Sequence, residues 1–499
     1  MANSKVILDE ETLIDLTSDT VVQSALYSGY TATSADGQKL SGTARITQED
    51  SIIKHTISTY ENSTITSIGS YAFKSCASLT FASMPACTYI GSDAFMSCTN
   101  LSSVFMPNVI SISSRAFYSC TSLSVDISFP ECTTLGENAF NNARRITGVN
   151  LPKCSIIPSS CFYYCFSVSY VSLSTATVIQ DAAFHSCSSL LTVDLPNATT
   201  LCDRAFQQCY SLQTVNIPNC TTIGSEAFYR CDSLSSINMP SVVSIGTSDD
   251  LWGTFGNCSC LESISLPVCE FIGGTAFKGC TSLSYAYLPI CKTIYDGAFY
   301  NTGLVSINLP SLDTCTGTVF GYCSSLVSVS VPLLSKITSR MFVNCTALSS
   351  FNFSNITSIG DSAFEGCTSL TGNISLSKCT SVGVGAFKGC TGITAVNMSQ
   401  NFPYGPYNST FYGCSSLSII SVGGGNPGTG AFAGCVRLTK LYVYSTYAFD
   451  LSNDVFTSTP IGGYTAYTGG VYGSIYVKAS LVSQYKSRWS SVSSRIFSM

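Results

Sequence analysis

The stretch that decides the fold is FQQCYSLQTVNIPNCTTIGSEAFYRC, residues 206–231. Leu212, Val215 and Ile217 mark a short strand, because alternate side chains of a strand point to the same face. These three side chains are expected to face a core, whereas Thr214 and Asn216 between them are expected to point outward. The stretch therefore starts with a strand that buries one face.

The second half of the stretch brings the chain back to the core. Pro218 ends the strand, since proline has no backbone N–H to donate to a sheet. The Ile-Gly pair at 223–224 then turns the chain into a brief helical segment, in which Ala227, Phe228 and Cys231 present an apolar face inward. Strand, turn and helical segment together predict one supersecondary unit.

This unit recurs from residue 65 onward as Ile-Gly-x-x-Ala-Phe-x-x-Cys-x-x-Leu-x-x-Val-x-Leu-Pro. A single unit cannot bury its own apolar face, but stacked neighbours can, so the pattern predicts a repeat solenoid with a continuous core. The spacing of the anchoring Phe is mostly 22 residues and always between 21 and 27. The 18 anchoring Phe residues lie at 73, 95, 117, 140, 162, 184, 206, 228, 255, 277, 299, 320, 342, 364, 387, 411, 432 and 456.

The repeat, written AFxxCxxLxxVxLPxxxxxIG, resembles the BspA-like (type 5) class of bacterial leucine-rich repeats over roughly residues 60–477. This resemblance implies a right-handed leucine-rich repeat array of short parallel strands and short helical or 3-10 turns. It also implies a binding scaffold without a conserved active site, since members of the class are mostly surface-associated or host- and matrix-interacting proteins. Typical members carry a signal peptide, whereas no apolar signal core follows Met1 here.

Residues 1–50 do not fit the repeat and are interpreted as an acidic attachment or capping module. VILDEETLIDLTSDTV predicts a short helix or an extended segment, and GYTATSADGQKLSGTARI predicts a hairpin that turns at Asp36-Gly37. Together the two segments resemble N-terminal segments of tail-associated proteins in phages and prophages of Gram-positive gut bacteria. The alternative is a cap that shields the first repeat, and one module can serve both purposes.

The array, predicted over residues 51–477, ends in a last strand at 475–477, and residues 478–499 are expected to form a capping helix. Leu481, Val482, Tyr485 and Trp489 fall on one face of that helix, and Ser480 is the expected N-cap. Terminal repeats of a solenoid need a polar outer face for solubility, which is the reason for a cap.

Charge excludes several classes of partner. Charged residues make up only 10% of the chain, against about 25% in an average soluble protein. Residues 1–50 hold eight acidic and three basic residues, so the remaining 449 residues are neutral overall. A neutral body offers no electrostatic attraction to nucleic acid or to anionic membranes. No apolar run reaches the roughly 18–20 residues of a membrane span, so membrane insertion is not expected.

The cysteines are predicted to be core residues. Fifteen of the 26 lie three residues after the anchoring Phe, and seven more lie two residues after the Pro position. A residue that recurs with the period of a solenoid is a core position, and free cysteine behaves as a small buried hydrophobe. Reduced thiols suit synthesis in the cytoplasm. Only two histidines, His55 and His185, accompany them and no Cys-x-x-Cys pair occurs, so no metal, cofactor or catalytic residue is predicted.

Ligand contacts are expected at outward strand positions and at irregular repeats, because the other positions are needed for the core. Aromatic residues interrupt the small polar outward side chains, and a five-residue insertion precedes Phe255. A second irregular stretch, NFPYGPYNSTF, and the Tyr-rich last repeats favour the C-terminal third as a contact surface. The candidate contact residues are Tyr170, Asp249, Asp250, Trp252, Tyr285, Tyr287, Phe402, Tyr404, Tyr407, Tyr464 and Tyr467.

Two functions fit these observations. The first is a non-enzymatic recognition protein of a phage or prophage particle, assembled after cytoplasmic synthesis. In that reading residues 1–50 attach to particle proteins and the solenoid binds a protein or glycan on a bacterial surface. The alternative is a BspA-like cell-surface adhesin that binds a host or matrix protein or a glycan. The sequence contains no heptad stretch that would predict a coiled-coil trimer, and the oligomeric state stays open.

Overall fold

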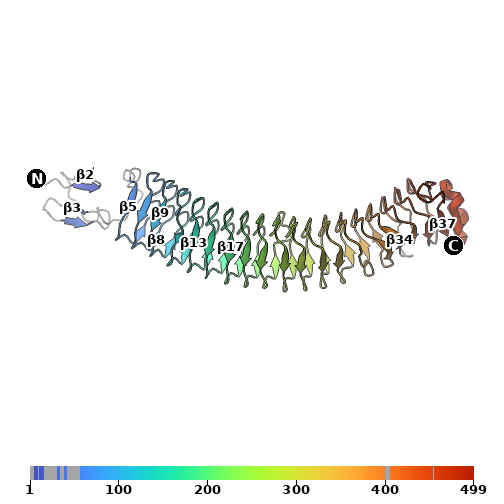
Figure 1. Cartoon of the computed structure of the whole chain (residues 1–499), viewed down its shortest axis with the longest axis horizontal. Coiled ribbons are helices and arrows are strands. Elements are labelled where there is room, and N and C mark those ends of the chain that lie inside the picture. Colours follow the sequence, from blue (N-terminus) through green and yellow to red (C-terminus); the bar gives the residue numbers. More distant parts are fainter. Residues whose placement is uncertain are drawn as a thin grey trace. The chain divides into compact units, whose positions relative to one another are not determined.

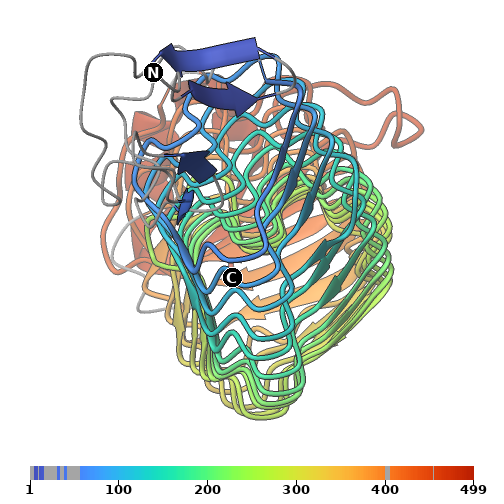
Figure 2. The same ribbon diagram turned by 90° about the vertical axis from the view of Figure 1, so that its left-hand side faces the viewer.

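The computed structural model describes residues 57–398, 405–452 and 454–499, together with the backbone of four short strands within residues 5–41. The chain divides into two compact units, Met1–Met239 and Pro240–Met499. In each unit the repeats form successive coils joined by parallel strand pairs (Figures 1 and 2). The predicted repeat solenoid is therefore confirmed.

Each coil of the first unit contributes two strands. The face strands follow the repeat Leu and pair in parallel with the next coil, for example Thr192 with Thr214 and Asp194 with Asn216. The back strands contain the repeat Ile before Gly and pair in the same way. The face strands are β5 Thr59–Glu61, β7 Phe81–Ser83, β9 Ser103–Phe105, β11 Ile127–Ser128, β13 Gly148–Asn150, β15 Tyr170–Ser172, β17 Thr192–Asp194, β19 Thr214–Asn216 and β21 Ser236–Asn238. The back strands are β6 Ser67–Ile68, β8 Tyr89–Ile90, β10 Ser111–Ile112, β12 Thr134–Leu135, β14 Ile156–Ile157, β16 Val178–Ile179, β18 Thr200–Leu201 and β20 Thr222–Ile223.

The second unit repeats the arrangement, and its last face strands are longer. Its face strands are β23 Ser263–Ser265, β25 Tyr285–Tyr287, β27 Ser306–Asn308, β29 Ser328–Ser330, β32 Gly372–Leu376, β34 Ile393–Met398, β35 Ile419–Val422, β36 Lys440–Val443 and β37 Ser474–Val477. Its back strands are β22 Ser244–Ile245, β24 Phe271–Ile272, β26 Thr293–Ile294, β28 Thr314–Cys315, β30 Lys336–Ile337, β31 Ser358–Ile359 and β33 Ser381–Val382.

The core of each unit is a row of stacked phenylalanine rings. In the first unit Phe184, Phe206 and Phe228 are fully buried, with ring centroids 5.3 and 5.6 Å apart and nearly parallel planes. Such a stack forms because identical side chains in register lie one strand spacing, about 4.8 Å, from their copies. Leu212, Val215 and Ile217 are buried beside the row, and Thr214 is exposed, as the sequence predicted.

The segments around these rings are tight turns and not the expected helical segments. Among the described residues no helix precedes Ala479. In most coils the residues two before and two after the Phe have positive φ, as Glu226 (57°) and Arg230 (58°) do. A right-handed helix needs consecutive negative φ values. The left-handed residues instead direct alternate N–H groups toward the next coil, where Phe206 N and Gln208 N donate to Ala227 O and Tyr229 O, both at 2.8 Å.

The cysteine after each Phe joins the same network. Cys231 is buried, and its Sγ donates to the carbonyl oxygen of Phe206 in the preceding coil, 3.2 Å away. The equivalent Thr459 is also buried and donates from its hydroxyl to Phe456 O at 2.7 Å. The position therefore requires a small side chain, and most repeats use one with a donor, although Ala143 is buried at the same position without one.

Both ends of the chain depart from the repeat. Strands β1 Lys5–Leu8 and β2 Glu11–Asp15 pair antiparallel, so the extended alternative holds there. Strands β3 Thr31–Thr33 and β4 Lys39–Ser41 also pair antiparallel, as the predicted hairpin requires. Every strand pair of the described repeats is parallel, which sets these two pairs apart.

The C-terminal cap is present but differs from the prediction in two respects. It contains η2 Ala479–Leu481, α2 Val482–Arg488 and η3 Ser490–Arg495, followed by an unforeseen strand, β38 Ile496–Ser498, that pairs with β37. The predicted N-cap at Ser480 is wrong, because this residue lies inside η2 and neither helix start has a side-chain cap.

Packing against the last coil holds the cap in place. Of the four residues predicted to face inward, Leu481, Tyr485 and Trp489 are buried and Val482 is half-buried. Trp489 Nε1 donates to Phe449 O at 2.8 Å. The indole of Trp489 is therefore packed and hydrogen-bonded, which ties the cap to the coil that carries Phe449.

We predict that Phe206→Ala destabilises the first unit by about 3–5 kcal/mol, the usual cost of deleting a buried aromatic ring. The ring contacts the stack on both sides, so its removal leaves a cavity between two coils. Urea unfolding of the full chain, with hydrogen exchange over residues 180–235, measures the loss. The control is Thr214→Ala on the exposed face of the same repeat, expected within about 0.5 kcal/mol of the parent protein. Equal effects of the two substitutions would contradict the assigned core.

Candidate functional site: the outward strand face

The outward side of the face strands is a polar surface whose side chains bond to each other along the stack. Asn238 donates through Nδ2 to Asn216 Oδ1, and Asn216 donates to Asp194 Oδ1, both at 2.8 Å. In-register parallel strands place identical positions side by side, which favours such ladders. Because β17 and β19, which carry Asp194 and Asn216, pair with a strand on each side, this surface is a preorganised scaffold for side chains that contact a ligand.

Exposed aromatic rings interrupt this polar surface where the sequence predicted them. On β25 of the second unit, Tyr285 and Tyr287 are 55% and 46% exposed. On the first unit Phe105 of β9 is 54% exposed and Tyr170 of β15 is 42% exposed. Exposed rings that combine an apolar face with a polar tip are favoured for binding.

Tyr170 takes part in a cluster that the sequence did not reveal. Its hydroxyl donates to Asp126 Oδ2, and Asp126 Oδ1 accepts a hydrogen bond from the Thr147 hydroxyl at 2.6 Å. These two bonds hold the pKa of Asp126 below its ordinary value, and the same carboxylate raises the pKa of Tyr170. Asp126 and Tyr170 are 44 residues apart in the chain.

Gly148 makes this contact possible. A Cβ at Gly148 would lie 2.3 Å from the Tyr170 ring, so the ring lies directly over this glycine of the intervening coil. Tyr170 therefore reaches across β13 to the coil that carries Asp126. The sequence contained one relevant signal, the 23-residue spacing between Phe117 and Phe140, in which Val125 and Asp126 stand where other repeats have one outward residue.

The extra residue opens a groove beside this cluster. Among the described strands, β9 is the last of one sheet of face strands and β11 is the first of the next. These two strands do not pair. The gap forms a cavity of about 310 Å³ lined by Phe105, Met106, Asp126, Ser128 and Phe129, among others. Phe105 and Asp126 both border this groove and are both exposed.

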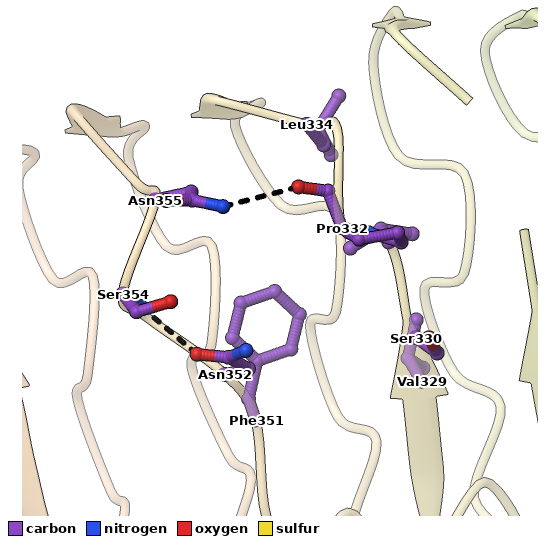
Figure 3. Close-up of a pocket in the computed structure, with 9 residues that line it drawn as sticks. Val329, Ser330, Pro332, Leu334, Phe351, Asn352, Ser354 and Asn355 are labelled. Carbon is purple, nitrogen blue, oxygen red and sulfur yellow. Dashed lines mark hydrogen bonds between the residues drawn. The ribbon is translucent and has the colours of Figure 1, made fainter. Parts of the chain in front are cut away.

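The second unit contains a smaller hollow at a comparable interruption. A single bridge, Ser328 to Ser350, joins β29 to the next coil. The cavity of about 160 Å³ is lined by residues that include Val329 and Phe351 (Figure 3). Its polar rim is already bonded internally, since Asn355 Nδ2 donates to Pro332 O at 3.2 Å.

In the five-residue insertion of the second unit only part of the prediction holds. Asp249 and Trp252 are exposed, Trp252 at 55%. The prediction of Asp250 as a ligand contact is wrong, because its side chain is buried. Asp250 Oδ1 instead accepts hydrogen bonds from the backbone N–H groups of Gly253, at 3.0 Å, and Trp252, at 3.3 Å, and so shapes the loop.

The other C-terminal candidates are partly described. Tyr407, Tyr464 and Tyr467 are exposed at 38%, 41% and 61%. The rings of Tyr464 and Tyr467 contact each other with centroids 6.0 Å apart. Phe402 and Tyr404 lie outside the described residues.

The reactive side chains of the core are buried. Of the 26 cysteines, all free, only Cys260 is exposed and only Cys202 and Cys315 are half-buried. Burial raises the pKa of Cys120, Cys280 and many other thiols, to about 12 for these two. His185 is buried and stacked on Tyr163 at 4.5 Å, and burial lowers its pKa.

The described residues show neither a metal-binding cluster nor a membrane-spanning helix. In the described part of the chain no three His, Cys, Asp or Glu side chains lie close enough together to hold a metal ion. Within the same residues no helix combines the length and hydropathy that crossing a bilayer requires.

These coils, with their buried Leu, Phe and Cys positions, define a leucine-rich repeat solenoid. The model of the BspA type leucine-rich repeat region matches residues 55–169, 155–249, 252–371 and 335–461. The chain therefore belongs to the BspA-type leucine-rich repeat family. Solenoids of this kind are in general non-enzymatic binding scaffolds.

Several solved structures are similar to this chain. A leucine-rich repeat protein from Bacteroides ovatus is 22% identical, with 76% of this chain and 82% of that chain covered and a TM-score of 0.40. A leucine-rich cell surface protein from Faecalibacterium prausnitzii is 21% identical, with coverage of 77% and 84% and a TM-score of 0.32. A leucine-rich repeat protein of T. pallidum is 26% identical, with coverage of 36% and 78% and a TM-score of 0.28. No curated protein matches the chain.

We predict that a thiol reagent labels one cysteine, Cys260, rapidly in the native protein at pH 8. Only the thiolate reacts, burial keeps the other thiols from the reagent, and it raises the pKa of many of them, Cys280 among them. Absorbance of the released chromophore counts the reacted thiols. Cys260→Ser should remove the fast reaction, and denaturant should expose all 26 thiols of the parent protein. Rapid labelling of many thiols without denaturant would contradict the buried ladder.

Proposed function

We propose that this protein is a non-enzymatic recognition protein of a phage or prophage particle. Its solenoid binds a protein or glycan on a bacterial surface, and residues 1–50 attach it to particle proteins. The observation that carries the recognition role is the paired-strand scaffold that holds large rings in solvent, above all Tyr285 and Tyr287. Preorganised rings lose little side-chain entropy on binding.

The particle assignment is supported by the N-terminal sequence. The segments LIDLTSDTV and GYTATSADGQKLSGT resemble tail-associated proteins, and the antiparallel pairs β1–β2 and β3–β4 differ from the parallel coils. A separate module suits attachment, because it leaves the strand face of the solenoid available for a receptor.

The second candidate is a cell-surface adhesin. Membership of the BspA-type family supports it, since the family provides a binding scaffold suited equally to an envelope protein. The two proposals share the recognition face and differ in where the protein is found.

We predict that the chain sediments with particles from a producing culture and that deletion of residues 1–50 releases it. Immunoblots of cytosol, envelope and high-speed pellet measure the distribution. The matched control is Tyr285→Ser with Tyr287→Ser, which alters the recognition face and should leave particle association unchanged. Recovery in the envelope, with none in the particle pellet, would overturn the particle proposal and favour the adhesin.

A further inference from the structure

We propose that the groove lined by Phe105 and Asp126 in the first unit, together with the Tyr170 ring that contacts Asp126, binds an uncharged, hydroxyl-rich glycan. This inference deepens the recognition role proposed above and rests on it. It names a site outside the C-terminal third, where the sequence placed the contact surface.

The groove results from a defined irregularity of the repeat. Val125 and Asp126 occupy the place of one outward residue, and strand pairing is interrupted between β9 and β11. The resulting cavity of about 310 Å³ lies at the lower end of small-ligand pockets, which span about 300–1,000 Å³. A standard protein–protein interface is a far larger surface. The size therefore favours a few sugar rings over a folded partner.

Asp126 is oriented before any ligand arrives. Thr147 donates to its Oδ1 and Tyr170 donates to its Oδ2. These two bonds hold the carboxylate in one orientation. A carboxylate oxygen has two acceptor positions, and each of these oxygens retains one. Ligand hydroxyls can donate to these positions, and hydrogen bonds to a charged acceptor are stronger than neutral ones.

The neighbouring groups match the two sides of a sugar ring. Phe105, 54% exposed at the groove wall, offers a flat apolar surface for the C–H face of a sugar. Ser128 and Asn150, joined by a hydrogen bond of 3.3 Å, add hydroxyl and amide groups at the rim. The ring of Tyr170 continues the surface over Gly148. From β11 to β15 the paired strands span two intervals, or about 10 Å, and the unpaired gap between β9 and β11 extends the site further.

Charge distinguishes between classes of glycan. Asp126 keeps its negative charge and is bonded only to neutral hydroxyls. The nearby Glu131 carboxylate is paired with Lys153 at 2.6 Å, so this lysine is neutralised by its partner. An anionic sugar would therefore meet an uncompensated carboxylate, which disfavours binding.

The test uses the full chain on an array of immobilised oligosaccharides. The array holds neutral glycans of bacterial envelopes, neutral host mucin glycans and sialylated or uronic-acid glycans. We expect binding to a neutral glycan. Whether the bound glycans are the bacterial or the host ones identifies the source of the ligand. Asp126→Asn should weaken this binding at least tenfold, because it removes the charge from the acceptor.

Gly148→Ala tests the geometry without removing a polar group. Its Cβ would displace the Tyr170 ring from Asp126, and we expect at least a tenfold loss of binding. Tyr170→Phe, which removes only the orienting hydroxyl, tests the same contact if Gly148→Ala fails to fold, as judged by circular dichroism. The control is Ser236→Ala on β21 of the same face, expected within twofold of the parent protein.

Three outcomes would overturn the proposal: no neutral glycan bound, binding only to anionic glycans, or equal binding by the parent protein and the Asp126 and Gly148 variants. The failure of the proposed function would look different. If the parent protein still adheres to bacterial cells while the array is negative, the recognition role survives and the glycan groove does not.

Discussion

The structure depends on one constraint, which is that each coil must present the same hydrogen-bonding groups and the same ring to the next coil at a single spacing. In the second unit, Phe255, Phe277 and Phe299 stack at 5.2 and 5.4 Å, close to the strand spacing of about 4.8 Å. Backbone ladders run beside this row on the face strands, on the back strands and through the turns. A coil that fails to match on one side loses the bonds of that side, as β9 and β11 do, while β10 and β12 behind them still pair.

This constraint explains backbone conformations that local propensity does not favour. Left-handed φ values at residues such as Glu226 and Arg230 are costly for side chains with a Cβ. They are tolerated because they direct backbone N–H groups toward the carbonyl oxygens of the neighbouring coil. Several later coils place glycine at the equivalent position, for example Gly389 and Gly413, where this cost disappears.

The constraint also determines where a ligand site can arise. In regular coils the outward side chains hydrogen-bond to the equivalent side chains of the neighbouring coils. They form polar rows such as Asp194, Asn216 and Asn238. Where one residue is added, as near Asp126, a strand pair is lost and a groove opens. Where five are added, a loop forms that exposes Trp252 and buries the side chain of Asp250. Irregular repeats are therefore the positions at which this fold can form a ligand site.

The sequence by itself determined the period, the inward and outward strand positions, the buried cysteine rows and the apolar face of the C-terminal cap. The first three follow from patterns repeated in most coils and the last from helix periodicity, so local chemistry was enough. Only the tertiary structure decided that the turns are not helical, that β38 follows the cap and that Asp250 is buried in its own loop. It alone brought Tyr170 over Gly148 to Asp126, two coils away. Each of these outcomes depends on hydrogen bonds to a neighbouring coil or on loop closure. One repeat read in isolation contains neither.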